Sequence, residues 1–373
     1  MSDSSALPEI LTVGLARLLL FAAGATLVGY TLLSAIKTVV LPRSANTTLA
    51  RIVFRLVRMV FDVRLRHAET YEDRDRVMAL YAPISLLMLP MVWLTMVLLG
   101  YMLIYIGVEN MALYEAFKLS GSSLLTLGFE RRDTVFGMIF EFSEAALGLV
   151  IVALLISYLP AMYSAFSKRE ALVTMLEVRA NTPPSPYQMI ARAYQIDGLA
   201  QMSELWELWE VWFAELEESH TSLAALVFFR SPLPGRSWVT SAGAILDSAA
   251  LMQSTVDVPN DPQAQLMILS GFLALRRIAD FFNISYNPDP APTDLISISQ
   301  AEYNELYDAL AEAGVPLKAD REQAWHDYAG WRVNYDRVLL ALAALTMAPY
   351  APWVSDRSLP RGTMYRRNGK SAK

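Results

Sequence analysis

Three long runs without a charged residue constrain this chain more than any other feature of its sequence. They cover residues 18–36, 77–108 and 145–167. A helix of about 20 residues crosses the ~30 Å hydrocarbon core of a bilayer, because each residue adds about 1.5 Å to its length. The sequence therefore predicts three membrane-spanning helices, in a chain of which 54% is hydrophobic.

A segment rich in arginine separates the first run from the second. Within it Arg51, Arg55 and Arg58 share one face of a predicted helix, and apolar side chains occupy the opposite face. Such a helix is typical of the membrane surface, where its apolar side dips among the lipids and its guanidinium groups meet anionic headgroups. The alternative, a voltage-sensing helix, repeats its arginines strictly at every third position, and this segment does not.

Basic residues also predict which way the chain faces. The arginine-rich segment and the pair Lys168 and Arg169 flank the spans on the same side. The positive-inside rule makes that side cytoplasmic. We therefore expect a multi-pass protein of the cell membrane, with an extracellular N-terminus and a cytoplasmic C-terminus.

Beyond residue 168 charged residues and prolines recur, which predicts a helical cytoplasmic domain. Helical periodicity is expected over residues 198–218, 237–253, 262–282, 299–313 and 320–347. The stretches around residues 183–186 and 287–292 are interpreted as linkers or exposed loops. In the first of these helices apolar residues share one side, which predicts a core face rather than an aromatic ligand cage. These residues are Leu205, Trp206, Leu208, Trp209, Trp212, Phe213 and Leu216.

The chemistry-bearing residues predict no enzyme and no cofactor. The chain contains no cysteine, which excludes disulfides and thiolate metal sites. His67, His220 and His326 are scattered without metal-ligand spacing, and no phosphate-binding loop or nucleophile elbow occurs. The net charge of −6 argues against a nucleic-acid partner.

Residues 112–130 lie between the second and third apolar runs and predict a re-entrant loop. They begin with a short amphipathic helix of about residues 113–125, too short to cross the membrane. A loop at membrane depth is tolerated only where its backbone is buried in protein or lines a water-filled path. The helix would direct its C-terminal end, which carries partial negative charge, toward that path. The arrangement favours a pore for cations.

The sequence GSSLLTLGFE at residues 121–130 resembles the pore loop of potassium channels, whose filter runs Thr, an aliphatic residue, Gly, Tyr or Phe, Gly, Asp. The flanking runs then resemble the outer and inner helices of the two-helix pore module, over residues 78–168. The resemblance implies a homotetramer with one loop per chain. It further implies a selectivity filter whose backbone carbonyls replace the hydration shell of a permeant ion. The matching residues are Thr126, Leu127, Gly128 and Phe129.

Two positions depart from the family pattern. Glu130 stands where the family has its second glycine, and Arg131 stands where it has aspartate. We expect Glu130 of several chains to form an acidic ring at the pore mouth, and selectivity for potassium stays open. Ser122 and Ser123 are expected to hold the loop through hydroxyl hydrogen bonds.

The third apolar run contains two candidate gating residues. Gly148 stands where the family's inner helix often bends, and Pro160 resembles the proline that bends that helix near the family's cytoplasmic gate. Proline removes a backbone hydrogen bond and kinks a helix, so Pro160 is a candidate hinge; the alternative is a helix that simply ends near the interface. Glu141 and Glu144 are interpreted as solvated charges at the outer interface rather than as an ion site.

These observations divide the chain into four parts. Residues 1–42 hold the N-terminus and first span, 43–77 the basic interfacial segment, 78–168 the pore domain and 169–373 the cytoplasmic domain. The expected function is an oligomeric channel, with permeant monovalent cations and membrane lipids as its partners. The alternative is a non-conducting scaffold or sensor anchored in the membrane. A transporter is disfavoured because no inverted repeat is present.

Overall fold

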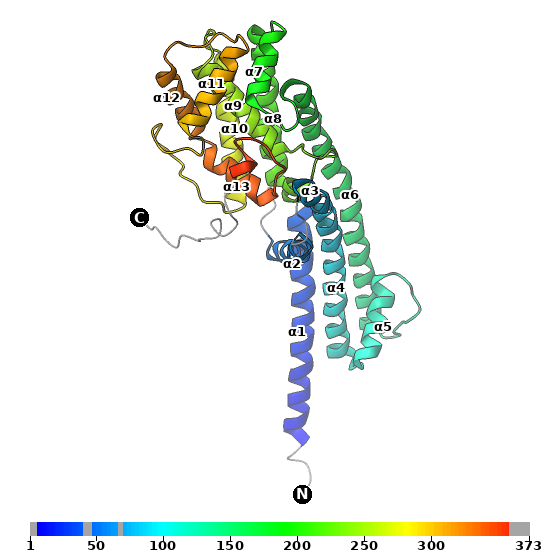
Figure 1. Cartoon of the computed structure of the whole chain (residues 1–373). Coiled ribbons are helices and arrows are strands. Elements are labelled where there is room, and N and C mark those ends of the chain that lie inside the picture. The colour runs from blue at the N-terminus through cyan, green and yellow to red at the C-terminus, as the bar shows by residue number, and fades with distance from the viewer. Residues whose placement is uncertain (1–5, 40–46, 66–69, 358–373) are drawn as a thin grey trace. The chain divides into compact units, whose positions relative to one another are not determined.

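The structure, a computed structural model, describes residues 6–39, 47–65 and 70–357 (Figure 1). Apart from an isolated β-bridge between Val256 and Leu317, every regular element in these ranges is helical. The α-helices are α1 (Ala6–Val39), α2 (Thr48–Leu65), α3 (Tyr71–Ala79), α4 (Tyr81–Glu109), α5 (Leu113–Leu124), α6 (Val135–Ala180), α7 (Pro186–Gln195), α8 (Met202–Ser222), α9 (Trp238–Ser254), α10 (Pro262–Phe281), α11 (Gln300–Glu312), α12 (Arg321–Arg332) and α13 (Asp336–Thr346). Short 3-10 helices lie at Leu199–Gln201, Ala224–Phe228 and Ser355–Arg357.

The chain forms two compact units, each with its own hydrophobic core. The first comprises Met1–Val60 and Pro83–Met162, and the second comprises Phe61–Ala82 and Tyr163–Lys373. Helix α6 therefore contributes to both units. The basic interfacial segment also divides between them, because its end packs with the second unit through an ion pair between Asp75 and Arg230 (3.0 Å).

Three helical stretches are long and apolar enough to cross a membrane, namely Thr12–Val39, Glu72–Glu109 and Val135–Ala180. This confirms the all-helical fold class and the prediction of three helices with the length and apolarity of a membrane span.

The predicted second span, residues 77–108, lies within the apolar stretch Glu72–Glu109. A break at Leu80 divides it, because α3 ends at Ala79 and α4 begins at Tyr81. Pro83 accounts for the break. In an uninterrupted helix its ring would collide with the carbonyl of Ala79, whereas in the first turn of a new helix its missing N–H is no loss.

The third span continues past its predicted end at residue 167, as α6 extends to Ala180. Arg169, which follows the predicted span, is buried in the second unit. Its guanidinium group donates to the carbonyl oxygens of Leu226 (2.9 Å) and Phe229 (2.8 Å) and pairs with Glu170 (2.7 Å). These contacts satisfy the buried charge and hold the end of α6 in the second unit.

In the first unit, α1 and α4 approach closely through glycines. A Cβ built on Gly24 would stand 2.5 Å from the carbonyl oxygen of Gly100, and one built on Gly107 would stand 2.7 Å from that of Arg17. Small residues at such crossings are typical of helix packing in membranes, where close backbone contact replaces the hydrophobic drive present in water.

The core of the second unit confirms the predicted role of the tryptophan stripe. Trp206, Trp209 and Trp212 of α8 are at most 2% exposed and pack in the same core as α9, which is buried along its whole length. Leu208 was expected on the same face but is exposed, because its position in the helical turn lies to one side of the stripe.

One further expectation for the second unit was wrong. Residues 320–347 form two helices, α12 and α13, because the side chain of Asn334 donates to the carbonyls of Gly330 (3.1 Å) and Trp331 (3.2 Å). These bonds take up carbonyls at the end of α12 and compete with a continuing helix. The predicted linker around residues 183–186 is confirmed as the connection between α6 and α7, and Pro186 is the first residue of α7, a position proline favours.

Candidate functional site

Helix α5 is the short helix expected between the second and third spans. Its 12 residues make it about 18 Å long, less than the ~30 Å of a bilayer core. Figure 1 shows it beside α4 and α6. The face of α5 toward these helices is buried and consists of Ala116, Leu119, Ser120, Ser122, Ser123 and Leu124.

A buried polar cluster links α5 to both neighbouring helices. The Ser120 hydroxyl of α5 contacts the carbonyl oxygen of Leu98 in α4 (3.1 Å) and the carboxyl group of Glu144 in α6. Tyr105 of α4 donates its hydroxyl proton to the other oxygen of Glu144 at 3.0 Å. Glu144 thus connects α4, α5 and α6 through a single side chain.

The interpretation of Glu144 as a solvated charge is wrong. Its side chain is fully buried, because α6 turns this residue inward against α5. Glu141, one turn earlier, is half-buried and accepts a hydrogen bond from the backbone N–H of Arg132 (2.7 Å). The sequence signal that was missed is the mismatch between an acidic residue and the apolar residues Ala145, Ala146 and Leu147 that follow it.

The predicted filter begins as the cap of α5. The N–H of Thr126 donates to the carbonyl of Ser123 (3.0 Å), and the N–H of Leu127 donates to that of Ser122 (2.8 Å). This pair of bonds is the Schellman motif, which satisfies carbonyls at a helix end and requires one residue in the left-handed conformation. Thr126 takes that place with φ 55°, and Gly128 also has positive φ, at 71°. A β-branched residue at positive φ is strained.

Ser122 also holds the far end of the loop. Its hydroxyl accepts from the backbone N–H of Glu130 at 3.1 Å, while its carbonyl accepts from Leu127. Ser122 therefore joins both ends of the segment 127–130 to α5. Ser123 is buried and contributes its carbonyl to the cap.

The carboxylate of Glu130 is paired within its own chain. It forms an ion pair with Lys118 of α5, and this hydrogen bond raises the pKa of Lys118 above its ordinary value. Both side chains are about one-third exposed. An acidic ring formed by Glu130 would therefore be accompanied by an equal number of lysines.

The carbonyl groups of the loop differ from its N–H groups. The N–H groups of Thr126, Leu127 and Gly128 all point back to α5. In contrast, no hydrogen bond within the described ranges reaches the carbonyl oxygens of residues 126–129. The side chains of Leu127 and Phe129 are exposed in the single chain. The loop thus presents unpaired acceptors without competing donors.

The two candidate gating residues lie inside one uninterrupted helix. Helix α6 runs through both Gly148 and Pro160. Gly148 packs against the end of α5, and this close approach accounts for a glycine there without any hinge. A gating role for either residue stays a prediction.

No family model, no curated protein and no solved structure matches this chain. The resemblance of residues 121–130 to a potassium-channel pore loop therefore stands on that stretch and on its place between two apolar helices. What the chain does has to be inferred from the contacts around α5.

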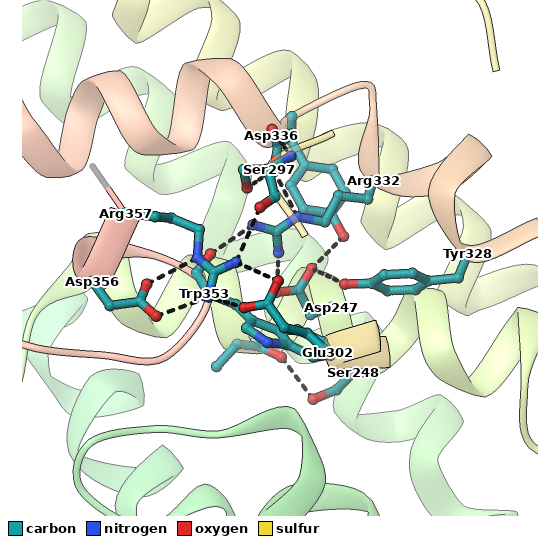
Figure 2. Close-up of polar contacts among 12 residues, drawn as sticks. Asp247, Ser248, Ser297, Glu302, Tyr328, Arg332, Asp336, Trp353, Asp356 and Arg357 are labelled. Atoms are coloured by element: carbon teal, nitrogen blue, oxygen red, sulfur yellow. Dashed lines mark hydrogen bonds and ion pairs between the residues drawn. The ribbon is translucent and has the colours of Figure 1, made fainter. Parts of the chain in front are cut away.

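The second unit holds a buried charge network that the sequence analysis missed (Figure 2). Arg332 is fully buried, pairs with Asp247, and donates from Nε to Asp336 at 2.9 Å. Tyr335 donates to Asp247 at 2.8 Å, and Arg332 reaches the carbonyl of Trp353 at 2.6 Å. Burial raises the pKa of Asp247, although Arg332 acts in the opposite direction. Arg332 of α12 thereby joins α9, α13 and the segment that follows α13.

Histidines show no metal-binding arrangement where they are described. Burial lowers the pKa of His220 well below its ordinary value, so the neutral ring accepts a hydrogen bond from Arg169 (3.3 Å). His326 is exposed beside Glu322, and His67 lies outside the described residues. In the part of the chain that the structure describes, no group of three or more His, Asp or Glu side chains is placed to hold a metal ion.

Proposed function

We propose that this chain is one subunit of an oligomeric cation channel, in which the loop that follows α5 lines the ion path. The observation that carries the proposal is the polarity of the loop backbone. Its N–H groups are used by the cap of α5, and its carbonyls at residues 126–129 have no partner in the described chain. Unpaired carbonyls at membrane depth need water or cations.

The placement of α5 supports the same function. A helix of about 18 Å lies between two stretches that are long enough to cross a membrane, which supports a re-entrant path for α5 and its loop into the bilayer and back to the same side. The C-terminal end of α5 carries partial negative charge and leads directly into the loop. Both features favour a cation over an anion.

Several copies are needed to enclose a path. One loop cannot surround an axis, and the resemblance to potassium channels indicates a homotetramer. Exposed apolar side chains on the loop, Leu125, Leu127 and Phe129, support contacts with neighbouring subunits, since isolated exposure of such residues at a loop is unfavourable.

The net charge at the entrance of the proposed pore affects how strongly cations are attracted to it. Lys118 neutralises Glu130 in each subunit, so the mouth attracts cations less strongly than an unpaired acidic ring. We propose that the carbonyls at residues 126–129 select monovalent cations, with potassium as the reference ion.

Helix α2 supports placement in the cell membrane with its basic segment on the cytoplasmic side. One face of α2 is buried through Leu49 and Val53. The other presents exposed apolar residues, which are Ile52, Leu56, Met59, Val60 and Val63. Arginines border this strip, and such a surface fits an anionic leaflet. The N-terminus is then extracellular and the C-terminus cytoplasmic.

The test is the reversal potential of the full-length protein in planar bilayers, under opposed potassium and sodium gradients. We expect a cation current whose reversal potential changes in Gly128→Ala, because alanine is strained at φ 71°. Gly121→Ala is the matched control, since a Cβ there meets nothing within 4 Å. A protein that is monomeric in detergent and carries no cation current would contradict the channel and favour the scaffold or sensor.

A further inference from the structure

Glu144 is an acidic residue in a place that does not suit a charge. It is fully buried within the first unit. The hydroxyls of Tyr105 on α4 and Ser120 on α5 contact it. The other titratable groups that act on it are Tyr101 of α4 and Glu141 of its own helix. Helix α1 reaches this part of α6 through Phe21, which packs on Phe140.

Among the residues that the structure describes, no cation compensates a carboxylate at this position. Lys118, the basic residue of α5, is paired with Glu130, and Arg132 is near Glu115. In the described part of the chain no lysine or arginine forms an ion pair with Glu144. An ionised carboxylate buried without a countercharge is strongly unfavourable, and it becomes neutral where it can.

The protons of the cluster lead to the same conclusion. The Ser120 hydroxyl has one proton but contacts two acceptors, the carbonyl of Leu98 and one oxygen of Glu144. The Tyr105 proton serves the other oxygen of Glu144. If Glu144 is a neutral acid, its own proton goes to the Ser120 hydroxyl, and Ser120 donates its proton to the carbonyl of Leu98. The three contacts of the cluster, with Leu98, Ser120 and Tyr105, then hold one proton each. An ionised Glu144 leaves one of these contacts without a proton.

We propose that Glu144 is a positioning residue that binds a proton, and that as a neutral acid it fixes α5 between α4 and α6. Loss of the proton makes Glu144 compete with Leu98 for the single proton of Ser120 and introduces a buried charge. The effect reaches the loop because Ser122, on the same short helix, holds Leu127 and Glu130. The protonation of Glu144 does not depend on whether the protein conducts ions. Its effect on ion flow rests on the proposed function.

The first experiment detects the proton directly. The full-length protein in lipid vesicles at neutral pH is compared with Glu144→Gln by infrared difference spectroscopy. We expect the carbonyl band of a buried protonated carboxylic acid in the wild type and its loss in the variant. If Glu144→Gln loses a carboxylate band and no carboxylic acid band, the proposal is overturned.

The second experiment measures the position of α5 by hydrogen–deuterium exchange of residues 113–124. Glutamine reproduces the neutral acid, because its amide donates to Ser120 while its oxygen accepts from Tyr105. We expect unchanged exchange in Glu144→Gln and about tenfold faster exchange in Glu144→Ala, as after loss of one buried hydrogen bond. If Glu144→Ala does not fold, Ser120→Ala replaces it, and we expect the same faster exchange of residues 113–124. Glu141→Gln is the matched control. Fast exchange in Glu144→Gln overturns the proposal.

Measurements of cation current distinguish the proton site at Glu144 from the proposed channel function. With both proposals correct, alkaline solution reduces the cation current of the wild type but not that of Glu144→Gln. The infrared band and the exchange pattern in a protein without any current would support the proton site and contradict the channel alone. Equal sensitivity of both proteins to alkaline solution would contradict the effect of Glu144 on the loop.

Discussion

The carbonyl oxygen of Leu124 lies directly against Gly148, so that a Cβ built on Gly148 would stand 2.4 Å from that oxygen. The contact joins the last residue of α5 to the first turn of the charge-free run in α6. It lies one turn beyond Glu144, and the two residues together set where α5 ends. The loop begins from that end.

Gly148→Ala tests this contact. The added methyl group has to displace the backbone of α5, which we expect to destabilise the protein by about 1–3 kcal/mol. The measurement is thermal unfolding of the detergent-solubilised full chain. Gly29→Ala in α1 is the control, because a Cβ there meets nothing within 4 Å. Equal stability of the two variants would contradict the close packing of α5 on α6.

Thr126→Gly tests the strain at the cap of α5. Glycine adopts positive φ without steric penalty, so we expect the variant to be about 1 kcal/mol more stable despite its greater freedom when unfolded. Leu125→Gly is the control, because Leu125 has φ −88° and gains nothing from the change. A loss of stability in Thr126→Gly similar to that of the control would show that the threonine is unstrained.

Lys118→Met tests the charge balance of the mouth. Removal of the lysine leaves Glu130 unpaired, which increases the attraction for cations near the loop. We expect a larger single-channel cation conductance than in the wild type, mainly below about 0.1 M salt, where the Debye length exceeds ~10 Å. Glu130→Gln should lower the conductance under the same conditions. Conductances independent of both changes would place Glu130 away from the ion path.

Arg332→Met tests the buried network of the second unit. The change leaves Asp247 and Asp336 without their cation, and we expect a loss of about 3–5 kcal/mol. Intrinsic fluorescence reports unfolding of this unit, because all eight tryptophans except Trp93 belong to it. Arg277→Met, at an exposed ion pair with Glu217, is the control with an expected loss below about 1 kcal/mol.

Glu302 gives the second unit a defined pH dependence. Its hydrogen bonds with Arg357 and Ser299 lower its pKa from 4.5 to about 2, despite some burial. The folded state therefore binds this proton more weakly than the unfolded state. The resulting stability is complete above pH 4.5 and is lost as the pH falls toward 2. We expect Glu302→Gln to lose less stability than the wild type over this window in acid titrations followed by fluorescence, and equal losses would contradict the pairing with Arg357.

Local patterns in the sequence predicted much of the fold. The three charge-free runs predicted the three helices that are long and apolar enough to cross a membrane. The short amphipathic stretch predicted α5 to within one residue of its observed end at Leu124. The spacing of Trp206, Trp209 and Trp212 predicted a buried stripe. Such predictions succeed because helices are set by hydrophobic periodicity and by helix-breaking residues, and both act over only a few residues of sequence.

The polar contacts of the candidate site were decided by tertiary structure alone. Glu144 was misinterpreted because its partner Ser120 lies 24 residues away, and Asp247 was overlooked because Arg332 lies 85 residues away. A carboxyl group in the sequence is the same whether it meets water, a hydroxyl or a guanidinium group. The sequence by itself determined where helices form and which are apolar enough for a membrane. Packing decided which helix faces meet, and with them which charges are buried, paired or neutral.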